Sequence, residues 1–418
     1  MLSLAILGCG SRGRTYSSIA ALFPERYRLA AAADPLLESR AAVAATAAEA
    51  PHLFASAGEL LASGRLADIA VISTQDRDHA GPALTALGQG YHLLLEKPAA
   101  TTLDECRAIL AAARASERRV ILCYVLRHTP FYRTVREFVD AGKLGDLITI
   151  HASEGVEPWH QAHSFVRGHW ARSADSTPMI LAKSCHDLDL LAWFAGRPCR
   201  RVSSFGSLSH FKAAHAPPGA TARCTDPCPL AGACMFDAHR YASDKRNWLR
   251  MLRPDAMDLT DKQIVEWLAT APWGRCAWQC DNDAVDHQVV AMEFEGGLTA
   301  SFTMTAFDCG RRLTLYGTKG VLRGGPERSD GPGGAQLWFQ DHASGATATV
   351  PVPETSAEGY HGHGGGDFGL IDSLDRLIEV PAIDAFAQED WFESHLIGFA
   401  AEQSRLEGGR SIDLAPLR

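Results

Sequence analysis

The sequence lacks two features that define large functional classes. No apolar stretch approaches the roughly 18 residues that a transmembrane helix requires, so we expect no membrane partner. A basic excess is also missing, because the formal net charge is -9, and nucleic-acid surfaces normally need clustered lysine and arginine. An apolar strand pattern begins at Leu2 and leaves no room for a secretory signal peptide. The eleven cysteines are odd in number and scattered, which argues against a disulfide framework and favours a reducing cytoplasm.

Apolar runs alternate with helix patterns in the N-terminal part of the chain. This alternation predicts an α/β fold with a doubly wound parallel sheet, the Rossmann type of dinucleotide-binding domain, over residues 1–124. The strands are expected at Leu2–Leu7, Arg28–Ala33, Ala67–Ser73, Tyr91–Leu95 and Val120–Tyr124, and the first helix at Arg14–Leu22.

The pattern changes after Arg127. Residues 125–418 predict an α+β domain with an open, mainly antiparallel sheet. Helices are expected at Thr134–Ala141 and Met179–Phe194, and strands at Leu147–Ala152, Val289–Phe294, Leu298–Thr305, Arg312–Tyr316 and Gln336–Phe339. A cysteine-rich insertion at about 212–286 interrupts this domain.

A glycine-rich segment, Gly8-Cys9-Gly10-Ser11-Arg12-Gly13, follows the first expected strand. Glycines at this point let the backbone approach a pyrophosphate at a helix N-terminus, where unpaired N–H groups favour an anion. The residues that we assign to cofactor binding here are Gly8, Gly10, Ser11, Arg12 and Gly13.

Asp34 ends the second expected strand. An acidic side chain there usually accepts a hydrogen bond from the ribose 2′-hydroxyl and repels a 2′-phosphate, which favours NAD over NADP. The distance from Gly8 along the chain exceeds the usual spacing of about 20 residues. The alternative role is a helix N-cap, because Asp34-Pro35 is a good helix start.

A second motif, Glu96-Lys97-Pro98, follows the expected strand at Tyr91–Leu95. Its lysine would lie at the end of a parallel strand, beside the position of a nicotinamide ring. Each motif alone is a weak signal, and strand context at both favours dinucleotide binding. We assign Thr74, His79, Glu96 and Lys97 to the same cofactor site.

These two motifs, together with His186-Asp187-Leu188-Asp189-Leu190-Leu191 and Gly317-Thr318-Lys319-Gly320, resemble the Gfo/Idh/MocA family of nicotinamide-dependent sugar and polyol oxidoreductases. The resemblance implies that Lys97 and His186 are catalytic and that Asp189 contacts substrate. One position departs from the family pattern. Polyol dehydrogenases of the family place an aspartate four residues before the helix histidine, and this chain has Ala182 there. The aspartate–histidine proton relay is therefore not carried over.

Hydride transfer from a carbinol needs a base for the hydroxyl proton, and histidine can supply it near neutral pH. An ammonium beside the same oxygen stabilises the developing alkoxide. Lys97 and His186 fit these two roles, and the sequence leaves open which one holds the proton. Lys183 lies three residues before His186, so we expect both on one helical face, with a surface salt bridge as the alternative for Lys183.

The segment from Glu154 to Trp170 predicts a substrate loop, because tryptophan faces pack on sugar C–H surfaces and polar side chains bond hydroxyls. The residues assigned to substrate are Glu154, Trp159, His160, Arg167, Lys183 and Asp189. A polar surface loop with packed tryptophans is the alternative. The glycine-rich segment that contains His361, His363 and Asp367 is a second, weaker candidate for a substrate loop.

Five cysteines fall in the insertion, and four of them suggest a tetrahedral zinc site. Cys224, Cys228, Cys234 and Cys276 are the expected ligands, with Cys280 in reserve. A metal could also supply a folding centre to an insertion with few aliphatic residues. The alternative is a set of reduced thiols without metal.

Three functions remain open at this point. The first is an NAD-dependent dehydrogenase acting on a secondary hydroxyl of a sugar, sugar acid or polyol. The second is a redox-neutral glycoside hydrolase or epimerase with tightly bound NAD. The third, a non-enzymatic sensor, is disfavoured by the retained Lys97 and His186. The expected partners are a small carbohydrate, anionic if Lys97, Lys183 and Arg167 converge, and further copies of the chain in a homodimer or homotetramer formed through the C-terminal sheet.

Overall fold

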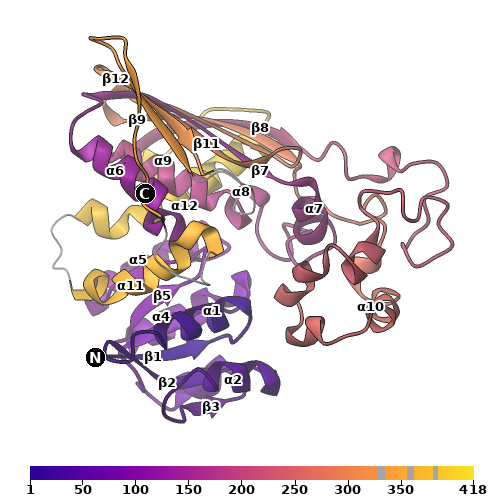
Figure 1. The fold of residues 1–418 in the computed structure, drawn as a ribbon. Coiled ribbons are helices and arrows are strands. Elements are labelled where there is room, and N and C mark those ends of the chain that lie inside the picture. Colours follow the sequence, from indigo (N-terminus) through magenta and orange to yellow (C-terminus); the bar gives the residue numbers. More distant parts are fainter. Residues whose placement is uncertain (327–334, 355–361, 380–384) are drawn as a thin grey trace.

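The computed structural model describes residues 1–326, 335–354, 362–379 and 385–418. Two sheets dominate these residues, and helices fill the space between them (Figure 1). His361 lies outside the described residues. No helix within the described ranges combines the length and the apolar character needed to cross a membrane.

The N-terminal sheet has the strand order β3-β2-β1-β4-β5-β6, and its strands pair in parallel. Helices cover both faces, which is why the inner strands are almost continuously apolar. The strand order reverses beside β1, and in sheets of this type a dinucleotide binds at the carboxyl ends of the strands at such a point. The predicted Rossmann sheet is confirmed. The elements are β1 (Leu2–Leu7), α1 (Ser11–Ala20), β2 (Tyr27–Ala33), α2 (Leu37–Ala44), β3 (His52–Phe54), α3 (Ala57–Ala62), β4 (Ile69–Ile72), α4 (Ala80–Gly88), β5 (His92–Leu95), α5 (Leu103–Ser116) and β6 (Val120–Leu122).

The C-terminal sheet follows the order β14-β13-β12-β11-β7-β10-β9-β8-β15. Among the described pairings, β10 and β7 are parallel and the others are antiparallel. The expected open, mainly antiparallel sheet is confirmed. Its strands are β7 (Leu147–Val156), β8 (Cys199–Ser207), β9 (His287–Phe294), β10 (Thr299–Thr305), β11 (Cys309–Gly317), β12 (Gly320–Gly325), β13 (Gln336–Asp341), β14 (Thr347–Thr349) and β15 (Ile412–Asp413).

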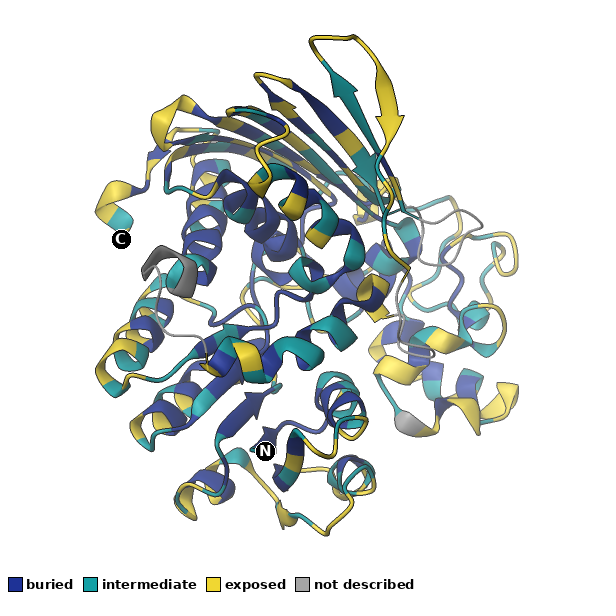
Figure 2. Cartoon of the chain, turned by 60° about the vertical axis from the view of Figure 1, so that its left-hand side comes forward, coloured by how far each residue is buried: buried dark blue, intermediate teal, exposed yellow. Residues whose placement is uncertain are grey.

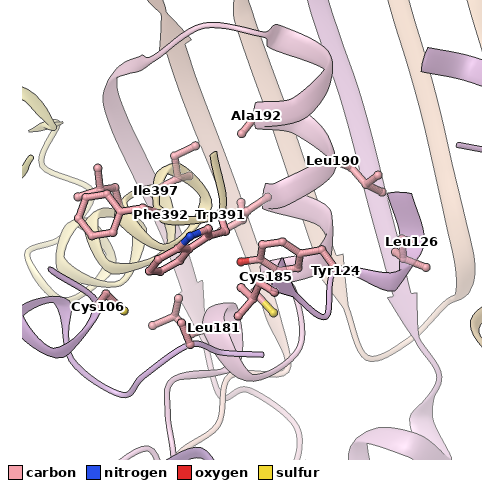
Figure 3. Close-up of a cluster of buried hydrophobic side chains, with 14 of the residues drawn as sticks. Cys106, Tyr124, Leu126, Leu181, Cys185, Leu190, Ala192, Trp391, Phe392 and Ile397 are labelled. Atoms are coloured by element: carbon pink, nitrogen blue, oxygen red, sulfur yellow. The ribbon is translucent and has the colours of Figure 1, made fainter. Parts of the chain in front are cut away.

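The remaining helices lie mainly beneath the inner face of this sheet and against the Rossmann domain (Figure 1). They are α6 (Pro130–Asp140), α7 (Pro158–His160), α8 (Met179–Ala182), α9 (Cys185–Ala195), α10 (Asp261–Leu268), α11 (Gly366–Glu379) and α12 (Ala385–Leu406). One apolar core joins the two sheets, and it includes Leu95 from β5, Phe302 from β10 and Leu396 from α12. Figure 3 shows Tyr124 and Cys185 close together in this core, with Leu181 and Trp391 beside them.

The outer face of the C-terminal sheet is exposed along alternate residues of its strands, whereas the inner face is buried (Figure 2). Large apolar side chains interrupt this otherwise polar face. Ile148 is 50% exposed, Phe205 58%, Val289 44% and Tyr316 38%. The described chain therefore leaves an apolar sheet face without a covering layer.

The insertion forms a separate lobe beside α7 (Figure 1). It consists of short helical turns and α10 around an aromatic core that includes Trp159, Tyr241, Leu249 and Trp273. The lobe thus has an apolar folding centre of its own.

Candidate active site

The glycine-rich turn between β1 and α1 has the geometry of an anion cradle. A Cβ at Gly8, where φ is +93°, would lie 2.5 Å from the Ser73 carbonyl oxygen, and one at Gly13 would lie 2.1 Å from the Gly8 oxygen. Gly10 has open space instead, with nothing within 4 Å of its ideal Cβ. Gly10 is the N-cap of α1, and no side chain caps the helix, whose first residue is Ser11. The first N–H groups of α1 are therefore available to a phosphate.

Asp34 ties this turn to the end of β2. One carboxylate oxygen accepts from the Cys9 N–H at 2.8 Å, and the other accepts from the Leu36 N–H at 2.8 Å. The N-cap of α2 is Leu36, so Asp34 is not the cap that the sequence allowed as an alternative. The Arg40 guanidinium also donates to the Asp34 carbonyl oxygen at 2.7 Å, which places a cation beside the same edge. The ribose contact of Asp34 stays a prediction.

Arg12, assigned to the cofactor from its motif, is held in a network with two carboxylates. Its Nε donates to Glu96 at 2.6 Å, and its Nη2 donates to Asp367 at 2.6 Å. The Tyr16 hydroxyl donates to the same Glu96 oxygen at 2.6 Å. Burial would raise the pKa of Glu96, but Arg12 and Lys97 hold that pKa below its ordinary value. The network joins α1, the end of β5 and the start of α11.

Lys97 lies at the carboxyl end of β5, and the backbone after it is braced from two sides. The ring of His79 contacts the Pro98 carbonyl oxygen at 2.7 Å, and the Ala99 N–H donates to His395 Nε2 at 2.9 Å. His79 also contacts the Thr74 carbonyl oxygen at 3.2 Å. Two residues assigned to the cofactor, Thr74 and His79, thus support the segment that carries Lys97.

The Lys97 ammonium donates to the Ala182 carbonyl oxygen at 2.8 Å. Ala182 ends α8, so its carbonyl has no continuing helical partner. This is the position at which related polyol dehydrogenases place an aspartate. Here a backbone oxygen holds the ammonium at the start of the helix that carries His186.

His186 is buried, with 4% of its surface exposed, in the first turn of α9. Its Nδ1 is buried and has no hydrogen-bond partner among the residues that the structure describes. Burial, followed by the charges of Lys97 and His363, depresses the pKa of His186 well below the ordinary value, so the ring is neutral at pH 7. A neutral imidazole beside an ammonium can accept a proton while the ammonium stabilises the oxygen that loses it.

The expected single helix over Met179–Phe194 is wrong in one respect, because it breaks at Lys183 and Ser184. Ser184 has φ -82° and ψ 3°, outside the helical range, and α9 begins at Cys185. Lys183 forms a salt bridge of 3.0 Å with Glu154, which is 1% exposed. Lys183 and His186 therefore do not share a helical face, and Lys183 is not a surface cation either.

Glu154 belongs to a buried ion cluster that the sequence did not reveal. Arg311 from β11 pairs with Glu154 and, at 2.7 Å, with Asp187. Burial would raise the pKa of Glu154, but Arg311 and Lys183 lower it; burial raises the pKa of Asp187. Burial lowers the pKa of His160, and the nearby charge of Lys183 lowers it further. Asp187 connects this cluster to α9, because it is the residue after His186.

Three other residues assigned to substrate have different surroundings. Trp159, 3% exposed, packs edge-on against Tyr241 in the insertion core. Arg167 donates to the carbonyl oxygens of Arg275 and Phe236, both at 2.7 Å. Asp189, 1% exposed, is paired with Arg127. Each of these side chains is engaged inside the protein.

The cysteines of the insertion converge but do not form a metal site. Cys224, Cys228, Cys234 and Cys276 line one small cavity of about 20 Å³. Among the residues that the structure describes, no three or more histidine, cysteine, aspartate or glutamate side chains are placed to hold a metal ion. The zinc expectation is therefore not supported. The insertion has an apolar core among its described residues, which can serve as a folding centre without a metal.

Comparisons with known proteins agree with this geometry. Residues 2–124 match the model of the oxidoreductase family with an NAD-binding Rossmann fold, and residues 132–323 match the GFO/IDH/MocA C-terminal domain. The protein YteT of Bacillus subtilis (strain 168), named as an oxidoreductase, is 25% identical over 73% of this chain and 72% of its own length. Inositol 2-dehydrogenase 2 of Saccharopolyspora erythraea is 26% identical over 47% of this chain and about half, 54%, of its own length.

A solved structure has the same fold along the whole chain. Levoglucosan dehydrogenase in complex with NADH and levoglucosan superposes with a TM-score of 0.69 at 16% identity, covering 99% of both chains. One family assignment agrees with the strand order of the N-terminal sheet, the glycine turn at Gly10 and the two family matches. The chain belongs to the Gfo/Idh/MocA family of NAD-binding oxidoreductases.

Proposed function

We propose that the protein is an NAD-dependent dehydrogenase that oxidises a secondary hydroxyl group of a sugar, sugar acid or polyol. The observation that carries the proposal is that the Lys97 ammonium binds the Ala182 carbonyl, three residues before the first residue of the helix that carries the neutral imidazole of His186. The inositol and levoglucosan dehydrogenases similar to this chain support the class of substrate.

The cofactor would lie with its pyrophosphate at Gly10 and the first turn of α1 and its ribose near Asp34. When bound, NAD would accept the hydride from the carbinol carbon. Lys97 would donate a hydrogen bond to the reacting oxygen and stabilise its negative charge. His186, neutral at pH 7, would accept the hydroxyl proton. The cations and carboxylates of the buried ion cluster would neutralise each other, so the cluster would present little net charge to the substrate.

The support for an anionic substrate is weaker than the sequence suggested. Lys183 is paired with Glu154, and Arg167 is bound to backbone carbonyls of the insertion. Arg311 faces both Glu154 and Asp187. Lys97 is then the cation that a substrate would meet, and one ammonium suits an alkoxide. We therefore propose a neutral sugar or polyol.

Turnover assays test the proposal. Purified protein with NAD and a panel of polyols, aldoses and uronates should form reduced cofactor, measured by absorbance, with one or more neutral compounds. Release of an aglycone from a glycoside without net cofactor reduction would instead identify the redox-neutral hydrolase. No turnover of either kind with a protein that binds NADH would refute the proposal.

We also propose that copies of the chain assemble through the outer face of the C-terminal sheet. The exposed apolar side chains of Ile148, Phe205, Val289 and Tyr316 support this surface. A charged substitution on this face, Val289→Asp, should reduce the molar mass measured by light scattering. A monomeric wild-type protein would refute the assembly.

A further inference from the structure

A second histidine lies beside His186, and a carboxylate orients it. The ring centroids of His186 and His363 are 5.9 Å apart. His363 Nδ1 lies 3.1 Å from an oxygen of Asp367, which is 3% exposed and is itself anchored by Arg12. Because the carboxylate accepts at Nδ1, the neutral ring carries its proton there and leaves Nε2 as an acceptor.

The backbone holds this pair in place. His363 has φ +49° and ψ 39°, a left-handed conformation that is rare for residues other than glycine. Just after it, α11 begins in close contact with the segment Val125–His128, since a Cβ at Gly366 would lie 2.2 Å from the Val125 oxygen. The contact between Gly366 and Val125 fixes the start of α11, and with it the segment that carries His363.

His186 needs a neighbour that can take a proton. It is almost fully buried, its Nδ1 has no partner among the described residues, and Ala182 offers no carboxylate. Lys97, Arg311 and Lys183 add positive charge near the ring, and a cation cannot accept a proton. His363 contacts Asp367, and 41% of its side chain is exposed. It therefore lies beside the buried imidazole and is itself partly open to solvent.

We propose that His363, positioned by Asp367, relays the reaction proton between His186 and solvent. This rests on the proposed function. Oxidation of the carbinol sends the electron pair of the C–H bond to the cofactor as hydride and leaves the O–H proton on His186. That proton is transferred to His363 Nε2, directly after a small side-chain rotation or through one water. His363 then releases a proton to solvent, so both rings return to the neutral state. His363 is a positioning and relay residue, because it acts through His186.

The test variant is His363→Asn. Asparagine tolerates the left-handed conformation, and its amide can donate to Asp367 as Nδ1 does, but it cannot carry a proton. The matched control is His239→Asn in the insertion, because His239 is 39% exposed and pairs with Asp237 at 2.7 Å in the same way.

We expect His363→Asn to lower kcat by about 10- to 100-fold near pH 7, with the Tm and the Kd for NADH unchanged. Added imidazole should restore part of the rate, because a free base can replace the relay. His239→Asn should keep wild-type kcat. Wild-type turnover in His363→Asn, or a loss that imidazole does not restore, would overturn the relay.

A second measurement needs no turnover and separates this inference from the proposed function. Nitrogen-15 NMR of histidine-labelled protein, assigned by the signal missing in His363→Asn, should show the Nδ1–H tautomer at His363. The opposite tautomer would overturn the relay, even if the protein proves to be a dehydrogenase. Absence of any dehydrogenase activity with the expected tautomer would count against the proposed function and the relay with it.

Discussion

Gly10 offers a sharp test of the cofactor site, because its geometry separates binding from stability. An ideal Cβ at Gly10 meets nothing within 4 Å, and the backbone there has φ -68°, which alanine adopts easily. Gly10→Ala should therefore fold with a Tm close to that of the wild type. The added methyl would occupy the space in front of the first N–H groups of α1.

The expected loss of affinity follows from the hydrogen bonds at that helix end. A charge-assisted hydrogen bond contributes about 1.5–3 kcal/mol. Losing one through displacement of the pyrophosphate should weaken NADH binding by about 10- to 150-fold. In a thermal shift assay, NADH at about 100 times the wild-type Kd stabilises the wild type by ~2.7 kcal/mol. At the same NADH concentration, Gly10→Ala should lose about half to nine-tenths of this stabilisation.

Gly13→Ala is the contrasting variant. Its Cβ would lie 2.1 Å from the Gly8 carbonyl oxygen, so β1 and α1 would have to separate. This variant should lose Tm even without cofactor. Fluorescence titration with NADH and scanning fluorimetry measure the two quantities. Wild-type NADH affinity in Gly10→Ala would refute the placement of the pyrophosphate.

Three further predictions address the edge of the cofactor site, the reacting centre and the buried histidines. Asp34→Ala should weaken NAD binding more than NADP binding, measured by titration. Equal losses of affinity for both cofactors would mean that Asp34 only supports the turn through its hydrogen bond with the Cys9 N–H. Lys97→Met should lower kcat by roughly 100-fold or more. The control variant Lys262→Met, at a lysine on α10 whose side chain is 86% exposed, should keep the wild-type kcat. Wild-type activity in Lys97→Met would contradict the assignment of Lys97 to the active site. Burial lowers the pKa of His163 to about 3 and of His395 to about 4. Both rings stay neutral in the folded protein, whereas the same histidines in the unfolded chain bind protons below about pH 6.5. The free energy of unfolding should therefore fall by up to ~1.4 kcal/mol per pH unit for each ring as the pH drops from about 6.5 towards 4. Urea unfolding at pH 7, 6 and 5 checks this, and a midpoint that does not move would contradict it.

Local patterns in the sequence were enough to predict the fold type of the first domain and all of its strands except the short, largely exposed edge strand β3. β1 has the bounds that were expected, Leu2–Leu7, and the glycine motif lies at the turn after it. Such features depend on neighbouring residues, namely an apolar strand, a glycine turn and a helix start. The C-terminal sheet was predicted for the same reason, because alternation along each strand reflects one buried face.

The side-chain partners within the site could not be predicted, because they join distant parts of the chain. Arg311 meets Glu154 and Asp187 only when β11 pairs with β7 and α9 lies beneath them. Asp367 meets Arg12 across most of the sequence. The break at Ser184 was hidden as well, because an apolar period continues on both sides of it. Local composition does not show which carboxylates will form ion pairs with cations of another domain.

The bond between Arg12 and Asp367 has a consequence for any attempt to exchange domains among relatives. Residues 1–124 carry the glycine turn, yet the guanidinium inside that turn is neutralised partly by a residue near the end of the chain. A Rossmann unit cut out and fused to another substrate domain would bring Arg12 without Asp367, and Glu96 would face that cation alone. A chimera therefore has to carry α11 along with the first domain, as one inherited module made of two separate stretches of sequence.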